Sequence, residues 1–334
     1  MHCAMCNIWA NPTSAEEEFK PELLEKLPRL TSVNITGGEP FVRDDIQQIA
    51  EILLTKTKRI VFSTSGYFPD RIIEMAKRFP QIGYRISLEG LSCRNDMLRG
   101  REGGFDRGLK TLLELRRMGI KDIGFGITVS NDNSHDMLEL YELSRNLKMQ
   151  FATAAVHNSF YFHKYDNRID RTDDVCNDFD ELVQRLMKER SPKSWFRAFF
   201  NTGLINYVRG GRRLLPCEAG SENFFIDPFG NVLPCNGMDD TCRFGAMGNL
   251  HDDTFENIWN GERARTIRGQ VADCPKRCWM IGSVSPVMKK YIGHVAPWVI
   301  KNKLKVMAGG RVDTSCPPMY PAGNSDKQGV KRQL

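Results

Sequence analysis

The sequence predicts an α/β protein built on a parallel sheet, and two observations indicate this class. Strand-like segments rich in β-branched residues alternate with amphipathic segments at helical spacing. The connections between them are short, so consecutive strands are expected to be joined by right-handed helical crossovers. The predicted strands are 32–36, 59–64, 84–88, 122–129 and 150–156, and the predicted helices between them are 44–54, 70–78, 105–118 and 134–147.

Outside this alternating region the pattern predicts further helices. One is expected over 14–26, with Ser14 as its N-cap. Two more, over 178–188 and 194–208, are expected to act as a bridge, and another over 254–268 begins after Thr254 as its N-cap.

Composition is that of an ordinary globular protein. The 334 residues are 41% hydrophobic and 26% charged, and this length suffices for two domains. We find no apolar run long enough to span a bilayer and no secretion signal, so a cytoplasmic protein without a transmembrane segment is expected. The net charge of +6 is mild and spread along the chain, and therefore no nucleic-acid partner is expected.

Ten cysteines are many for a chain without an export signal. This context favours metal or cluster ligation over a disulfide framework. Cys3 and Cys6 have C-x-x-C spacing, which lets both thiolates reach one metal or cluster from a single loop. Alone, this pair could equally be half of a zinc site.

Four later cysteines form two local pairs. Cys217 and Cys235 bracket a β-hairpin predicted over 224–233, which returns the chain to its starting point. Cys274 and Cys278 form the second pair. Four thiolates suffice for one iron–sulfur cluster or one structural zinc, and their number does not distinguish the two.

These motifs together resemble a known family. Residues 3–9, Cys-Ala-Met-Cys-Asn-Ile-Trp, are similar to the second half of the C-x3-C-x2-C loop of radical S-adenosylmethionine (SAM) enzymes, and residues 36–40, Thr-Gly-Gly-Glu-Pro, also fit that family. The spacing of the four cysteines in 217–278 resembles the auxiliary-cluster extension called SPASM, and in particular its shortened form, twitch.

The resemblance implies a fold and a domain organisation. The expected fold is a partial (β/α)6 TIM-like barrel lacking its first strand, followed by a small C-terminal α+β domain. The expected parts are a radical SAM partial barrel at 1–165, a helical bridge at 166–209, a SPASM or twitch auxiliary-cluster domain at 210–285 and a basic C-terminal tail at 286–334. The family's first cysteine would lie two positions before Met1, so we expect this chain to begin late.

The resemblance also implies cofactors and the residues that bind them. Two 4Fe–4S clusters and SAM are expected. The expected cluster ligands are Cys3 and Cys6 for the first cluster and Cys217, Cys235, Cys274 and Cys278 for the auxiliary one. The candidates for the SAM pocket are Gly37, Gly38, Glu39, Pro40, Ser63, Ser65, Ser87, Glu89 and Arg99. For the two serines of the second strand end, loop capping is slightly favoured. For Arg99, a solvated surface position is as plausible as a fork for the SAM carboxylate.

The implied reaction is reductive cleavage of SAM to a 5′-deoxyadenosyl radical and hydrogen abstraction from a peptide or small-molecule substrate. The electron would pass to the auxiliary cluster, and an external donor such as flavodoxin or ferredoxin would supply the reducing electron. No catalytic side chain is predicted, and residues 160–165 are the best candidates for substrate contact, by position alone.

Two alternatives remain open. The chain could be a non-catalytic zinc or iron–sulfur protein, which colour would resolve, since thiolate-bound iron is brown and zinc colourless. Cys242 follows the hairpin closely enough to replace a ligand, although a buried or free thiol is the preferred interpretation.

Overall fold

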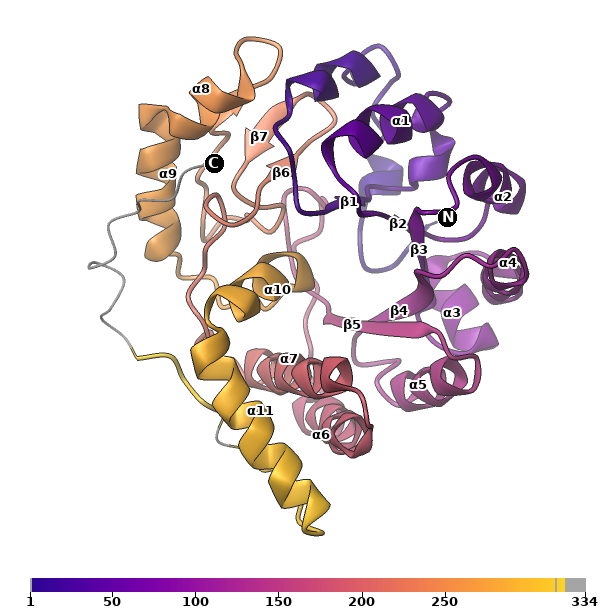
Figure 1. The fold of residues 1–334 in the computed structure, drawn as a ribbon, viewed down its shortest axis with the longest axis vertical. Coiled ribbons are helices and arrows are strands. Elements are labelled where there is room, and N and C mark those ends of the chain that lie inside the picture. The colour runs from indigo at the N-terminus through magenta and orange to yellow at the C-terminus, as the bar shows by residue number, and fades with distance from the viewer. Residues whose placement is uncertain (1, 316, 322–334) are drawn as a thin grey trace.

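The computed structural model describes residues 2–315 and 317–321, and at its centre is a curved sheet of five parallel strands (Figure 1). The strands follow chain order across the sheet, and each pairs in parallel with the next. They are β1 (Val33–Ile35), β2 (Ile60–Thr64), β3 (Gly83–Ser87), β4 (Ile123–Val129) and β5 (Gln150–Ala155). The predicted α/β class and all five predicted strands are confirmed.

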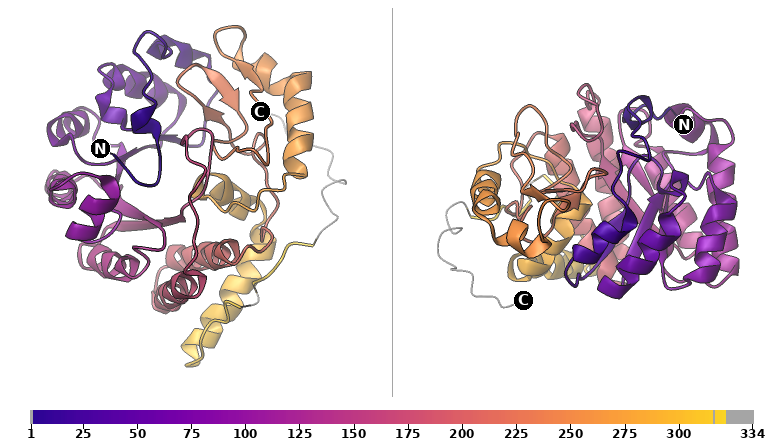
Figure 2. Two further views of the ribbon diagram at one scale, coloured as in Figure 1. Left: turned by 180° about the vertical axis from the view of Figure 1, so that it is seen from behind. Right: turned by 90° about the horizontal axis from the view of Figure 1, so that it is seen from above.

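Helices cover the outer face of the sheet, as Figures 1 and 2 show. They are α1 (Ile46–Lys56), α2 (Pro69–Arg78), α3 (Ser92–Arg99), α4 (Gly104–Arg117) and α5 (Asp136–Asn146). Sequence patterning did not predict α3, because its eight residues carry only two large apolar side chains, Met97 and Leu98.

The prediction of a helix over 14–26 is wrong. The structure has a turn followed by a 3-10 helix, Pro21–Lys26. Proline lacks the N–H that an interior helical residue donates, so a helix starting at Ser14 could not pass through Pro21 intact. Glu17 instead accepts from the backbone N–H of Ser14 at 2.8 Å, in a local turn.

The core lies between the sheet and its helices. Phe62, Tyr84 and Phe125 are fully buried on three adjacent strands, and the rings of Phe62 and Tyr84 stack with centroids 6.1 Å apart. Burial of one such side chain contributes about 1.5–3 kcal/mol. This packing fixes the strand ends, and thereby the loops that follow them.

After β5, the described residues form two long helices, a small antiparallel sheet and four further helices. These are α6 (Thr172–Lys188), α7 (Pro192–Val208), β6 (Phe225–Ile226), β7 (Asn231–Leu233), β8 (Gly248–Asn249), α8 (Phe255–Asn260), α9 (Glu262–Ala272), α10 (Ile281–Lys290) and α11 (Ile292–Met307). The predicted hairpin is confirmed. The predicted helix 254–268 is two helices separated at Gly261, and its N-cap is confirmed, since Thr254 Oγ1 accepts from the N–H of Asn257 at 3.2 Å.

The small sheet lies beside the open side of the curved sheet (Figure 2). The N–H of Phe19 donates to the carbonyl of Pro228 at 2.7 Å, which joins the N-terminal segment to the hairpin turn. Within the described residues, no helix is long and apolar enough to cross a membrane.

Candidate functional site

The first cysteine loop is held by backbone hydrogen bonds to two distant parts of the chain. Ala4 donates to the carbonyl of Leu98 at 2.8 Å, and Asn7 donates to that of Phe162 at 2.7 Å. The side chains of Cys3 and Cys6 lie next to each other, and this interaction raises the pKa of Cys3 and lowers that of Cys6 to about 6. The structure therefore brings these two thiols together in a fixed loop.

Gly37 and Gly38 lie against this cysteine loop. Gly37 has a φ of 154°, which residues with side chains rarely adopt. A Cβ on Gly38 would lie 3.1 Å from Cγ2 of Ile8, and one on Gly37 would lie 3.5 Å from Oη of Tyr161. Glycine at these positions allows the loop after β1 to approach the cysteine loop closely.

Glu39 braces the first two strand ends. Its carboxylate accepts from Thr64 Oγ1 at 2.6 Å and from both the N–H and the hydroxyl of Ser65, with the N–H at 2.8 Å. The buried Pro40 begins a 3-10 helix, Pro40–Val42. The interactions of Ser65 are those of loop capping.

The other two serine candidates lie at neighbouring strand ends. Ser63 donates to Oδ1 of Asn34 at 3.0 Å. Ser87 is half-buried at the last position of β3, where it pairs with Gly126. Neither interaction tests a role in SAM binding, so for both serines that role stays a prediction.

Arg99 is buried, so the solvated interpretation of this residue is wrong. Its Nη1 donates to Oε1 of Glu89 at 3.0 Å, and the two side chains are 12% and 4% exposed. Oε2 of Glu89 accepts from the N–H of Thr128 at 2.7 Å. Burial raises the pKa of Glu89 to about 7, although the Arg99 charge opposes this shift. The same Arg99 charge favours the thiolate forms of Cys3 and Cys6.

The second group of cysteines includes Cys278, which contacts the half-buried Arg213. Cys278 is buried, and Nη1 of Arg213 lies 3.8 Å from its Sγ and also donates to its carbonyl. Cys217 lies close enough to Cys235 and Cys278 for its charge to raise the pKa of both thiols. Burial is the main cause that raises the pKa of Cys235 to about 12. The hairpin thus returns its two cysteines to the same place as Cys278, as predicted.

Cys242, which was not among the predicted ligands, also belongs to this group. Its side chain is buried and lies next to that of Cys274. The sequence offered only its closeness to the hairpin as a signal. Cys316, the tenth cysteine, lies outside the described residues.

One segment, residues 157–167, connects the two cysteine sites, and we call it the connecting segment. On one side, Nδ2 of Asn167 donates to the carbonyl of Met5 at 3.0 Å. On the other, the N–H of Phe160 donates to the carbonyl of Met238 at 2.8 Å, and Lys276 donates to the carbonyl of Asn158. Part of this segment was predicted to contact substrate, and its observed contacts are with both cysteine-bearing loops.

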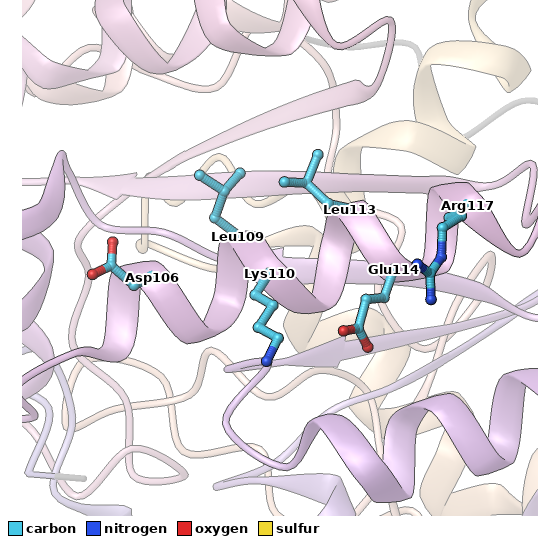
Figure 3. Close-up of a pocket in the computed structure, with 6 residues that line it drawn as sticks. All are labelled: Asp106, Leu109, Lys110, Leu113, Glu114 and Arg117. Atoms are coloured by element: carbon cyan, nitrogen blue, oxygen red, sulfur yellow. The ribbon is translucent and has the colours of Figure 1, made fainter.

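A surface hollow of about 330 Å³ lies elsewhere (Figure 3). All of its lining residues, which include Leu109 and Leu113, belong to α4. Ligand sites are usually formed by groups converging from several elements. We therefore place the functional site at the cysteines and not at this hollow.

The donor chemistry of the two sites fits iron–sulfur clusters. Thiolates are the usual ligands of such clusters. Among the described residues, no three His, Cys, Asp or Glu side chains are arranged to hold a single metal ion. A cubane cluster separates its ligands more widely than one ion does, so this result does not exclude a cluster. Both groups supply thiols, the donor type that a cluster takes.

Family models decide the classification. The radical SAM superfamily model matches residues 1–144, and the SPASM model, an iron–sulfur cluster-binding domain, matches residues 217–280. The chain belongs to the radical SAM superfamily. Its cofactors are accordingly SAM and 4Fe–4S clusters, including a SPASM-type cluster, and the predicted partial TIM-like barrel is confirmed.

Curated relatives include enzymes named maturases and synthases. Mycofactocin maturase MftC of Mycolicibacterium smegmatis is 26% identical over 82% of this chain and 71% of its own. Subtilosin biosynthesis protein AlbA of Bacillus subtilis is 28% identical over 78% and 57%. Fe-coproporphyrin III synthase of Methanosarcina barkeri is 32% identical over 45% and 39%. The chain thus matches less than two thirds of the length of the last two relatives.

Solved structures show the same fold. SuiB of Streptococcus suis superposes with a TM-score of 0.59 at 17% identity, covering 83% of this chain and 68% of its own. The structure of anSMEcpe with bound AdoMet gives 0.55 at 11% identity, covering 90% and 96%. These radical SAM neighbours share the curved half-barrel sheet with its surrounding helices.

Proposed function

We propose that this radical SAM enzyme abstracts a hydrogen atom from a peptide and passes the remaining electron to one auxiliary 4Fe–4S cluster. The observation that carries this proposal is the connecting segment, which contacts the loops of both cysteine sites. Because the two sites share this segment, a substrate beside it would lie near both.

In this proposal the barrel residues position the reactants. Cys3 and Cys6 hold the first cluster, and the backbone at Gly37 and Gly38 is open to the amino group of SAM. Arg99 offers a donor to the SAM carboxylate, since its Nε is buried and has no partner among the described residues. When bound, the cluster and SAM supply a 5′-deoxyadenosyl radical.

The remaining candidates have supporting roles in this proposal. Ser63 and Ser87 line the neighbouring strand ends, while Glu39 and Ser65 hold the loops together. Glu89 fixes the guanidinium of Arg99 by its hydrogen bond of 3.0 Å. Cys217, Cys235, Cys274 and Cys278 are the proposed ligands of the auxiliary cluster.

Peptide chemistry is supported by the named relatives. AlbA is a bacteriocin biosynthesis protein, and MftC is a maturase. SuiB has been solved bound to its precursor peptide SuiA. A tetrapyrrole is the second candidate substrate, because Fe-coproporphyrin III synthase has 32% identity over 158 residues.

The test is anaerobic reconstitution with iron and sulfide, followed by reduction with dithionite in the presence of SAM. We expect 5′-deoxyadenosine, detected by mass spectrometry. Its formation should rise with a short peptide encoded beside the gene, whose mass should fall by two hydrogens. Stimulation by coproporphyrin instead of peptide would favour the second candidate. A reconstituted brown protein that never cleaves SAM would refute both candidates.

A further inference from the structure

A single 4Fe–4S cluster takes four thiolate ligands, one for each iron, and the auxiliary site contains five thiols. Cys217, Cys235, Cys274 and Cys278 already provide four ligands, and Cys242 is a fifth, only 5% exposed. A buried thiol can simply be a small apolar side chain. The surroundings of Cys242 argue against that role.

Polar contacts fix the Cys242 loop against the Cys274 loop. Sγ of Cys242 lies 3.9 Å from Oδ1 of Asp239, and its N–H donates to the Asp239 carbonyl at 3.0 Å. Oδ2 of Asp239 pairs at 2.7 Å with Lys276, which lies between Cys274 and Cys278 in sequence. These two charged side chains are only 14% and 11% exposed, so the clamp is largely shielded from solvent.

The thiols of Cys242 and Cys274 meet at the end of this clamp. Their side chains lie next to each other, and both lie within electrostatic reach of Cys278. The other two thiols, Cys217 and Cys235, come from the ends of the hairpin. The site therefore contains five thiols. Three are single, those of Cys217, Cys235 and Cys278, and the other two form the adjacent pair of Cys242 and Cys274.

We propose that Cys242 and Cys274 are interchangeable fourth ligands of the auxiliary cluster. This inference rests on the proposed function, because it assumes the auxiliary ligand set given there. In the exchange, the iron–sulfur bond to Cys274 breaks and one to Cys242 forms. The proton that leaves the Cys242 thiol passes to the Cys274 thiolate, so neither the oxidation state of the iron nor the total charge changes.

The experiment isolates the auxiliary cluster in the full-length chain. In a parent carrying Cys3→Ala and Cys6→Ala, all cluster iron belongs to the auxiliary site. Cys242→Ala, Cys274→Ala and the combination of both are reconstituted anaerobically, and iron, sulfide and electron paramagnetic resonance spectra are measured. Cys176→Ala is the matched control, because Cys176 is equally buried but lies in α6.

We expect each single variant to keep about four irons and the combined variant to lose one, with a three-iron signal after mild oxidation. Each single variant should also release iron to a chelator about tenfold faster than the parent and the control, because its reserve ligand is gone.

Loss of the fourth iron in either single variant overturns the inference, as does an intact cluster in the combined variant. The single variants decide the question even if the combined variant does not fold. A parent without any auxiliary cluster would refute the proposed ligand set itself, which is a different failure.

Discussion

The two cysteine sites are built in different ways. The barrel site takes Cys3 and Cys6 from one short loop, whereas the auxiliary site gathers thiols from several segments between residues 217 and 278. Each site also has a partly buried arginine beside its thiols, Arg99 in the first and Arg213 in the second. Among the described residues, both arginines keep one buried nitrogen without a hydrogen-bond partner.

The arginines differ in how their charge is balanced. Arg99 is paired with the buried carboxylate of Glu89, while Arg213 forms no ion pair within the described part of the chain and instead contacts Cys278 and the ring of Trp279. An uncompensated positive charge and a hydrogen bond to sulfur both make a cluster easier to reduce. We therefore expect the auxiliary cluster to be the more easily reduced of the two, as the proposed electron transfer toward it requires.

The largest expected effect separates the two sites by function. Cys6→Ala should reduce 5′-deoxyadenosine formation to background and leave the auxiliary iron in place, because its thiol belongs only to the barrel site. Cys235→Ala should lower the auxiliary iron. SAM cleavage to 5′-deoxyadenosine should continue in this variant, but no modified product should form. Iron analysis and mass spectrometry measure both. If each substitution emptied both sites, they would be one unit and the comparison would fail.

Arg99→Met should strongly destabilise the fold. It leaves the Glu89 carboxylate, 4% exposed, without its partner. Breaking one side of a buried ion pair costs about 3–5 kcal/mol. Urea unfolding of the metal-free chain at pH 8, above the pKa of about 7 of Glu89, measures this loss, and adding Glu89→Gln should recover part of it. A loss similar to that of an exposed arginine, such as Arg168→Met, would contradict the buried pair.

Arg213→Met should shift the midpoint potential of the auxiliary cluster to more negative values, because it removes a positive charge and a donor nitrogen 3.8 Å from Sγ of the proposed ligand Cys278. Arg213→Lys should shift it less. Redox titration followed by electron paramagnetic resonance measures the potential. An unchanged potential with full cluster content would remove the proposed reason for electron flow toward this site.

The smallest expected effect concerns pH. Burial raises the folded-state pKa of Glu89 to about 7 from an ordinary value of 4.5. Between these values the folded chain holds a proton that the unfolded chain has lost, so the Glu89 contribution to stability falls as the pH rises through this window. The free energy of unfolding of Glu89→Gln should therefore depend less on pH between 5 and 7 than that of the unsubstituted chain. Parallel pH profiles would show that Glu89 titrates normally.

The sequence predicted what is encoded locally. Strands and most helices followed from periodicity, and the loop containing Gly37 and Gly38 followed from a motif at a strand end. The predictions that failed concern features that depend on distant contacts or on a single residue. Pro21, which breaks the helix expected over 14–26, is an example of the second kind.

The missed site residues have the same explanation. No spacing rule places Cys242 against Cys274, or Arg213 against Cys278, because these contacts depend on how the loops of the auxiliary domain pack. The burial of Arg99 likewise depends on Glu89, which lies at the end of a different element. Tertiary packing, and not local pattern, decides such contacts.

The connecting segment has a consequence for protein engineering. It leaves the barrel after β5 and contacts Met5 at one site and Met238 at the other. The auxiliary domain is therefore not an independent module that can be exchanged at the predicted boundary near residue 210. A chimaera that takes this domain from a relative would also need residues 157–167 from the same relative. The connecting segment and the loop that it contacts in the auxiliary domain would then come from one protein.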